Sequence, residues 1–183
     1  MTDGAEPPRG SGAASVPTGP SDRPARFEKA ARALAEARVR NRPVGEAGCG
    51  CPILVEGRRD EAALVALAFT GPIEVVNRGW DTGRLVAHLN DLYGTRNSVD
   101  GAASIILLMD WDRTGGRLQR SLSKRLQSLD VMVDGELRRR LSIALKPEGR
   151  TVEMLNAHVA ELLPLIDAED PPPPDAIHRA SSD

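Results

Sequence analysis

The stretch that decides the fold is Ile105-Ile106-Leu107-Leu108-Met109-Asp110-Trp111-Asp112-Arg113-Thr114-Gly115, an apolar run that ends in two carboxylates and a glycine. A run without polar alternation is typical of a strand buried on both faces of a parallel sheet. A second apolar run, Ile53-Leu54-Val55, ends in the same way, with Glu56 and Gly57. Open α/β sheets bind ligands beyond the carboxyl ends of their strands, so these acids are the first candidates for a functional site.

The candidate acids suggest a cation. Asp110 and Asp112 are two residues apart, so they point to the same side if the strand geometry continues through them. Three carboxylates at one sheet edge repel each other unless a cation lies among them, and Mg²⁺, or Mn²⁺ in its place, suits such a donor set. Structural roles stay open as well, because aspartate favours turns and helix caps and Glu56 could be an exposed loop acid.

Strands and helices alternate along the middle of the chain. Short apolar runs predict strands at 52–55, 73–76, 104–109 and 131–133. Leucine periodicity and capping residues predict helices beginning at Asp60, Asp81, Gly115 and Asp134. One more helix is expected from Phe27 to Arg40, and a last one from Thr151. This order predicts an α/β fold of about four mostly parallel strands with helices on both faces, plus an N-terminal and a C-terminal helix.

Length and composition define the expected domains. The 183 residues are enough for one ordinary domain with tails. Residues 1–24 are rich in Gly and Pro and residues 168–183 include four consecutive prolines, so both segments are expected to be disordered. Between them we expect an N-terminal helix and loop over 25–48, the α/β domain over 49–145 and a helical extension over 146–167.

Charge and hydropathy limit the partners. The net charge of −2 gives no global attraction to nucleic acid, so such a partner would need a local basic face. No apolar stretch approaches the roughly 20 residues that cross a membrane, so no membrane partner is expected. The N-terminus lacks the apolar core of a signal peptide, and Cys49 and Cys51 are too close together for an unstrained disulfide. A cytoplasmic location is therefore expected.

The acidic motifs resemble those of the Toprim domain, which is shared by bacterial-type primases, type IA and type II topoisomerases, recombination proteins and small nucleases. The resemblance covers roughly residues 50–145. It rests on Glu56-Gly57-Arg58-Arg59-Asp60, Asn77-Arg78-Gly79 and the Asp-Trp-Asp-Arg-Thr-Gly segment at 110–115. That last form is most similar to small archaeal Toprim proteins, and Thr151-Val152-Glu153 resembles a late segment of the ribonucleases that mature 5S ribosomal RNA.

The resemblance implies a Rossmann-like Toprim fold and a set of roles. Glu56 would act as general acid/base or metal ligand, and Asp110 and Asp112 would hold Mg²⁺ or Mn²⁺. Nearby cations are candidates for phosphate contacts because a guanidinium can bind phosphate bidentately, although each could instead belong to a solvated face. These cations are Arg58, Arg78, Arg113 and Arg117. Supporting positions are Gly57, Asp60, Gly79 and Gly115, with a helix cap as the ordinary role of Asp60.

Among Toprim activities the resemblance favours a magnesium-dependent nuclease acting on RNA or DNA. A topoisomerase would need a catalytic tyrosine domain, whereas Tyr93 lies at a predicted helix end. A homodimer or a larger protein partner could supply further grip on the substrate. The alternative is a non-catalytic Toprim module that binds nucleic acid or protein. Haloacid-dehalogenase-type phosphatases also use an Asp-x-Asp motif, but after their first strand, whereas here it follows the third.

Overall fold

The computed structural model describes residues 22–171. Its four strands are β1 (Ile53–Val55), β2 (Ile73–Val75), β3 (Ile105–Leu107) and β4 (Val133–Asp134). Its α-helices are α1 (Arg23–Asn41), α2 (Arg58–Ala66), α3 (Thr82–Tyr93), α4 (Arg113–Gln127), α5 (Glu136–Leu145) and α6 (Val159–Glu169). Two short 3₁₀ helices, η1 (Val44–Glu46) and η2 (Glu153–His158), complete the order.

The sheet is entirely parallel, with the strand order β2-β1-β3-β4. Ile53 of β1 is in register with Ile73 of β2 on one side and with Ile106 of β3 on the other. The chain leaves β1 toward β2 and then returns to add β3 on the opposite side of β1. The topological switch point therefore lies between the carboxyl ends of β1 and β3, which is where sheets of this kind bind ligands. The α/β architecture predicted from the sequence is confirmed.

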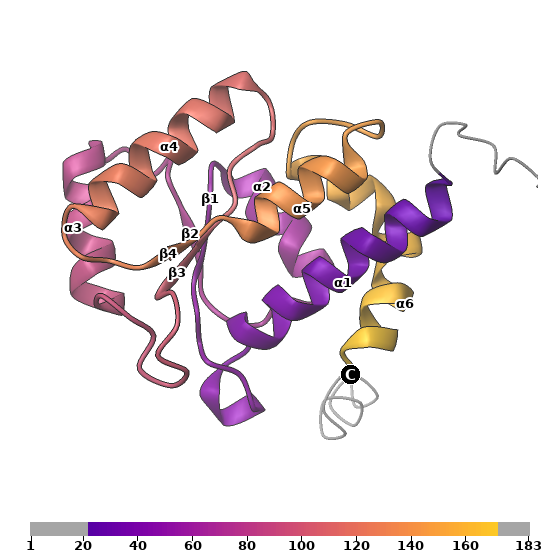
Figure 1. Ribbon diagram of the computed structural model, residues 1–183, viewed down its shortest axis with the longest axis horizontal. Coiled ribbons are helices and arrows are strands. Elements are labelled where there is room, and N and C mark those ends of the chain that lie inside the picture. The colour runs from indigo at the N-terminus through magenta and orange to yellow at the C-terminus, as the bar shows by residue number, and fades with distance from the viewer. Residues whose placement is uncertain (1–21, 172–183) are drawn as a thin grey trace, which may run out of the picture.

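Alternate residues of the central strands face two separate cores, as the pleat of a strand requires. One core lies against α1, α2, α5 and α6, and the other lies against α3 and α4 (Figure 1). The first receives Ile53, Val55, Ile106 and Leu108. The second receives Leu54, Ile105, Leu107 and Met109. Each fully buried aliphatic side chain of this kind contributes roughly 1.5–3 kcal/mol, so both helical layers are held to the sheet by apolar burial.

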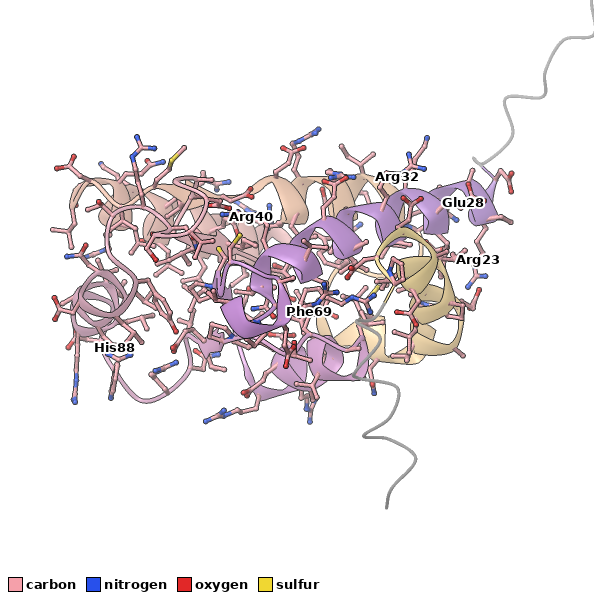
Figure 2. The ribbon with its side chains drawn as sticks, turned by 90° about the horizontal axis from the view of Figure 1, so that it is seen from below. Arg23, Glu28, Arg32, Arg40, Phe69 and His88 are labelled. Atoms are coloured by element: carbon pink, nitrogen blue, oxygen red, sulfur yellow. The ribbon has the colours of Figure 1, made fainter. Side chains whose placement is uncertain are left out.

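Helix α1 packs along α5 and α6 and is joined to them by ion pairs. Figure 2 shows Arg23, Glu28, Arg32 and Arg40 along α1, far from His88 on α3. Arg140 of α5 binds Glu36, and Arg23 binds Glu161 of α6. Arg26 binds Glu148, which follows α5. No helix within residues 22–171 is long and apolar enough to cross a membrane.

Several helix boundaries differ from the predictions for local reasons. Gly57 is the N-cap of α2, and Asp60 is the third helical residue, whose carboxylate reaches back 2.9 Å to the Gly57 amide. Asp112 caps α4, which therefore begins two residues before Gly115. The Asp134 carboxylate accepts from the Glu136 amide at 2.7 Å, although Gly135 occupies the cap position of α5.

The C-terminal part of the chain is ordered further than expected. Instead of one helix from Thr151, the chain forms the 3₁₀ helix η2 and then α6, which ends at Glu169. Asp170, inside the predicted tail, is 6% exposed because Arg38 and Arg42 bind its carboxylate. Helix α1 likewise begins at Arg23, two residues inside the other predicted tail. The rest of both predicted tails lies outside the described residues.

Candidate functional site

Four carboxylates meet at the switch point between β1 and β3. Glu56 follows β1 directly, Asp110 and Asp112 follow β3, and Asp60 comes from the first turn of α2. The Glu56 Oε1 atom accepts a hydrogen bond from the Asp110 amide at 3.0 Å, which ties the ends of the two strands together. We call these four residues the acid site. The structure thus brings together the three acids that the sequence singles out, with Asp60 beside them.

Each acid is held by a backbone amide. Asp110 Oδ1 accepts from the Val152 amide at 2.7 Å, and Asp112 Oδ1 accepts from the Gly115 amide at 2.7 Å. The acid site has no salt bridge: over residues 22–171 no Lys, Arg or His side chain lies within ion-pair distance of any of its carboxylates. Its negative charge is therefore balanced only by amide dipoles and by charges at longer range.

Burial and mutual repulsion raise the pKa values of three of the four acids. Burial raises the pKa of the Asp110 carboxyl to about 6, the charges of Asp60, Glu56 and Asp112 act in the same direction, and the Val152 amide opposes them. The pKa of Glu56 is raised mainly by burial, and the charges of Asp60 and Asp112 add to this effect. Burial also raises the pKa of Asp60. Perturbed carboxyls in a cluster at a ligand-binding edge are typical of functional sites.

The absence of a side chain at Gly115 allows α4 to pack against the strand ends at the acid site. A Cβ atom at this position would lie 2.1 Å from the Asp110 carbonyl oxygen and 2.7 Å from Glu56 Oε1. Any side chain would therefore push α4 away from the strand ends. The other two predicted glycines differ from it. Gly57 supplies an amide donor to Asp60, and Gly79 has a φ of +80° in the turn after β2.

Arg138 of α5 is the first of two residues at the site that sequence reasoning missed. Its Nε atom lies 3.0 Å from the Met109 carbonyl oxygen, and its Nη2 atom lies 2.7 Å from that of Asp110. Burial lowers the pKa of Arg138, and the nearby charge of Arg120 acts in the same direction. The only signal in the sequence was the cluster Arg138-Arg139-Arg140, which does not reveal the arginine that turns inward.

Gln119 of α4 is the second missed residue, and it extends the edge of β3. Its Oε1 atom accepts from the Met109 amide, and its Nε2 atom donates to the Leu107 carbonyl, both at 3.1 Å. The side chain thus satisfies strand groups that no neighbouring strand reaches. In the sequence Gln119 is one polar residue of an amphipathic helix, and nothing there marks it as a partner of β3.

The segment from Gly149 to Glu153 covers one side of the acid site through its backbone. Trp111 donates from its indole nitrogen to the Gly149 carbonyl at 2.7 Å and from its amide to the Arg150 carbonyl at 2.9 Å. Together with the bond from the Val152 amide to Asp110, these contacts place Thr151-Val152-Glu153 at the site. The exposed Glu153 side chain pairs instead with Arg59 at 3.6 Å.

The predicted phosphate-binding arginines separate into two groups. Arg78 lies over the Trp80 ring and binds Glu74 and the Val75 carbonyl, so its guanidinium already has partners. Arg58 is exposed and pairs with Glu61 at 2.7 Å, one turn along α2. Arg113 and Arg117 are exposed on α4 and have no acidic partner within the described part of the chain. Of the four predicted arginines, Arg113 and Arg117 are therefore the two that no acid among residues 22–171 pairs with.

The donor set of the acid site fits a hard divalent cation. Glu56, Asp110 and Asp112 each use one carboxylate oxygen to accept a backbone amide, which leaves the second oxygen for another partner. Among residues 22–171 no three acidic, His or Cys side chains already surround a common point as metal ligands. Mg²⁺ does not require such a group, because it is usually held by one or two carboxylates and keeps several waters.

Comparison with known proteins gives relatives whose names state no activity. A UPF0292 protein of Methanosarcina barkeri is 29% identical over 117 residues, which are 63% of this chain and 73% of that protein. A UPF0292 protein of Methanosarcina acetivorans is 28% identical over 113 residues, 62% of this chain and 72% of its own length. A third, from Thermoplasma volcanium, is 34% identical over 83 residues, 45% of this chain and 62% of that protein.

The other two comparisons add little. No protein-family model matches the sequence. A solved structure of a protein from Aquifex aeolicus aligns with 75% of this chain and 98% of its own, at 23% identity and a TM-score of 0.43. That likeness is too weak to support a conclusion. Neither the Toprim resemblance nor the metal is tested by these relatives, and both stay predictions.

Proposed function

We propose that this chain is a divalent-metal-dependent Toprim protein that cleaves phosphodiester bonds in nucleic acid. The observation that carries the proposal is the acid site itself, in which four carboxylates at the switch point of a parallel sheet have no ion-pair partner among residues 22–171. A cluster of this kind is costly to the folded protein unless a cation joins it. The order of the acidic motifs, which resembles that of Toprim proteins, supports the same assignment.

Each residue then has a definite task. Asp110 and Asp112 would hold Mg²⁺ or Mn²⁺, which when bound stabilises the charge that develops on the phosphate. Glu56, whose pKa is raised by burial, would act as the general acid/base through the carboxylate oxygen that the Asp110 amide does not occupy. Arg138 fixes the carbonyl oxygens of Met109 and Asp110 and so sets the direction of the Asp110 side chain.

The proposal includes the setting of the reaction. The substrate is RNA or DNA, the location is the cytoplasm, and a second copy of the chain or a larger partner adds contacts to the substrate. The small number of aromatic residues, 3% of the chain, favours recognition of the sugar-phosphate backbone over stacking on bases.

A second candidate is a Toprim module that binds nucleic acid or protein without cleavage. One observation favours it: each of the four acids accepts a hydrogen bond from a backbone amide, so each has a structural role that needs no catalysis. In that case the acids join β1, β3, α2, α4 and the segment before η2, and a metal adds only stability.

A cleavage assay decides between the two. The full chain is incubated with end-labelled structured RNA, duplex DNA and single-stranded DNA in Mg²⁺, in Mn²⁺ or in chelator. Glu56→Gln and the double variant Asp110→Asn/Asp112→Asn are compared with Glu28→Gln and Asp91→Asn, which change exposed acids on α1 and α3.

The nuclease proposal requires metal-dependent cleavage that falls at least about 100-fold in both acid-site variants and persists in both controls. If no substrate is cleaved with either metal while the folded wild type binds nucleic acid or protein, the binding module is the function. Equal cleavage by all the variants would trace the activity to a contaminant and overturn the nuclease proposal.

A further inference from the structure

Helix α4 carries five cations and no acid. They are Arg113, Arg117, Arg120, Lys124 and Arg125. All five are exposed, and none has a carboxylate within ion-pair distance in the stretch from residue 22 to residue 171. The arginines of α1 differ, since acids of α6 or of loops bind several of them, such as Arg23 and Arg38. The positive charge of α4 is therefore not used in holding the fold together.

A groove runs beside this helix. It has a volume of about 380 Å³ and lies between α4 and the segment from β4 to the start of α5. Helix α4 lines it with Gln119, Arg120, Ser123, Lys124 and Gln127, and Leu107, Val133 and Gly135 complete the lining. The polar groups along α4 are mainly cations and hydrogen-bond donors, and no acid from residues 22–171 lines this groove. Such a lining suits an anion.

The groove begins where the acid site ends. A Cβ atom on Gly116 would lie 3.3 Å from Arg138 Nη2 and 3.6 Å from Arg120 Nη1, so both guanidinium groups flank the first turn of α4. Arg138 also binds the carbonyl oxygen of Asp110. These two guanidinium groups repel each other, and neither of them pairs with the nearby carboxylates. A phosphate that lies between them relieves this repulsion.

We propose that this groove holds the phosphate backbone of the nucleic-acid strand that enters the acid site, with Arg138 and Arg120 at its start and Lys124 further along. The inference rests on the proposed function, since it names the surface that binds the substrate of that site. From Arg120 to Lys124 the helix rises about 6 Å, close to the axial rise of about two nucleotides of one strand. Recognition is independent of base sequence, because phosphates carry no sequence information.

The test measures binding without cleavage. Fluorescence anisotropy follows labelled single-stranded RNA, single-stranded DNA and duplex DNA in chelator over a range of salt concentrations. The variant Arg120→Gln/Lys124→Gln removes two exposed cations of the groove. The matched control Lys29→Gln/Lys146→Gln removes two exposed cations from α1 and the end of α5. Circular dichroism verifies that both proteins are folded.

The expected result is an affinity at least about 10-fold lower for the groove variant at about 100 mM salt, equally for oligonucleotides of different sequence. The slope of log K against log salt falls by about 1.4–1.8, because each lost phosphate contact removes about 0.7–0.9. The control retains the wild-type slope. The type of nucleic acid bound most tightly identifies the substrate class.

The outcomes separate this inference from the nuclease proposal. If binding depends on the α4 cations but no substrate is cleaved, the groove inference is supported and the nuclease proposal is wrong. If the substrate is cleaved but the wild type, the groove variant and the control have equal salt slopes, the groove inference is wrong and the nuclease proposal is supported. Binding of the wild type to vesicles containing phosphatidylserine, but to no nucleic acid, would also overturn the groove.

Discussion

The acid site and a second group of buried charges, at the junction of α1 and α6, differ in whether their carboxylates have cationic partners. At the junction, Arg38 Nε lies 2.9 Å from Asp170 Oδ2, and Arg42 binds the same oxygen at 2.5 Å. Arg38 also pairs with Asp167 at 2.8 Å. We call these four residues the arginine network. Its charges neutralise one another, whereas none of the four carboxylates of the acid site has a pairing cation in the described part of the chain.

This difference separates structural charge from functional charge. A buried ion pair that is complete contributes little net stability, but removal of one partner is strongly destabilising because the other charge stays buried. The arginine network therefore orients α6 against α1 and has no capacity for a further partner. The acid site has the reverse properties, because its charge is in excess and an added cation would relieve it.

The largest effect on stability is expected from a substitution that disrupts the arginine network. Asp170→Asn leaves Arg38, which is 3% exposed, and Arg42 without their shared carboxylate. We expect the free energy of unfolding, measured by urea titration, to fall by about 3–5 kcal/mol. Asp167→Asn is the control, since that side chain is 40% exposed, and it should cost less than about 1 kcal/mol. Equal losses would show that Asp170 is not the centre of the network.

The next largest effect is expected from a substitution that disrupts the acid site by a steric clash. In Gly115→Ala the new methyl group meets the Asp110 carbonyl and Glu56 Oε1, so α4 must shift. We expect a loss of about 2–3 kcal/mol in the free energy of unfolding. Gly45→Ala is the matched control, because a Cβ atom there has nothing within 4 Å. A neutral Gly115→Ala would mean that the strand ends and α4 are not packed as closely as described.

A smaller effect sharpens the comparison through pH. The pKa of Asp110 is about 6 in the folded protein and about 3.9 in an unfolded chain, so between these values the folded state binds more protons. The Asp110 contribution to stability is therefore favourable at low pH and is lost as the pH rises from about 4 to about 6. Asp110→Asn removes this loss and keeps an acceptor for the Val152 amide.

We expect Asp110→Asn to be more stable than the wild type by on the order of 1 kcal/mol at pH 7.5 in chelator, after allowance for solvent screening. At pH 4 the two proteins should unfold at the same urea concentration. Saturating Mg²⁺ at pH 7.5 should narrow the difference, because it stabilises the ionised wild type. A variant that is less stable at both pH values would show that Asp110 is structural in the same sense as Asp170.

The smallest effect concerns Arg58, which the sequence places beside Glu56. Its side chain is 80% exposed and pairs with Glu61 on its own helix. We expect Arg58→Gln to leave both the urea midpoint and the affinity for nucleic acid unchanged, in contrast to Arg120→Gln/Lys124→Gln. A loss of affinity as large as that of the groove variant would place the substrate across α2 and not along α4.

Predictions from the sequence succeed where the signal is local. The strand from Ile53 to Val55, the cap of α3 by Asp81 and the end of that helix at Gly94 are signalled within a few residues. The acids after β1 and β3 are found for the same reason, since each follows an apolar run directly. Arg138, Gln119 and the amide of Val152 are missed because their partners lie 10 to 42 residues away in the chain.

The sequence by itself determined the alternation of strands and helices, the identity of the acids at the strand ends and the excess of cations on α4. Hydrophobic periodicity and capping chemistry act over one or two turns, so one chain is enough to reveal them. Only the tertiary structure decided which charges are neutralised. It pairs Asp170 with Arg38 and Arg42 and turns Arg78 toward Glu74. Within residues 22–171 it leaves Glu56, Asp110 and the cations of α4 without an ion-pair partner. Ion pairing depends on distances of a few ångströms between residues far apart in sequence, and only the packed fold sets those distances.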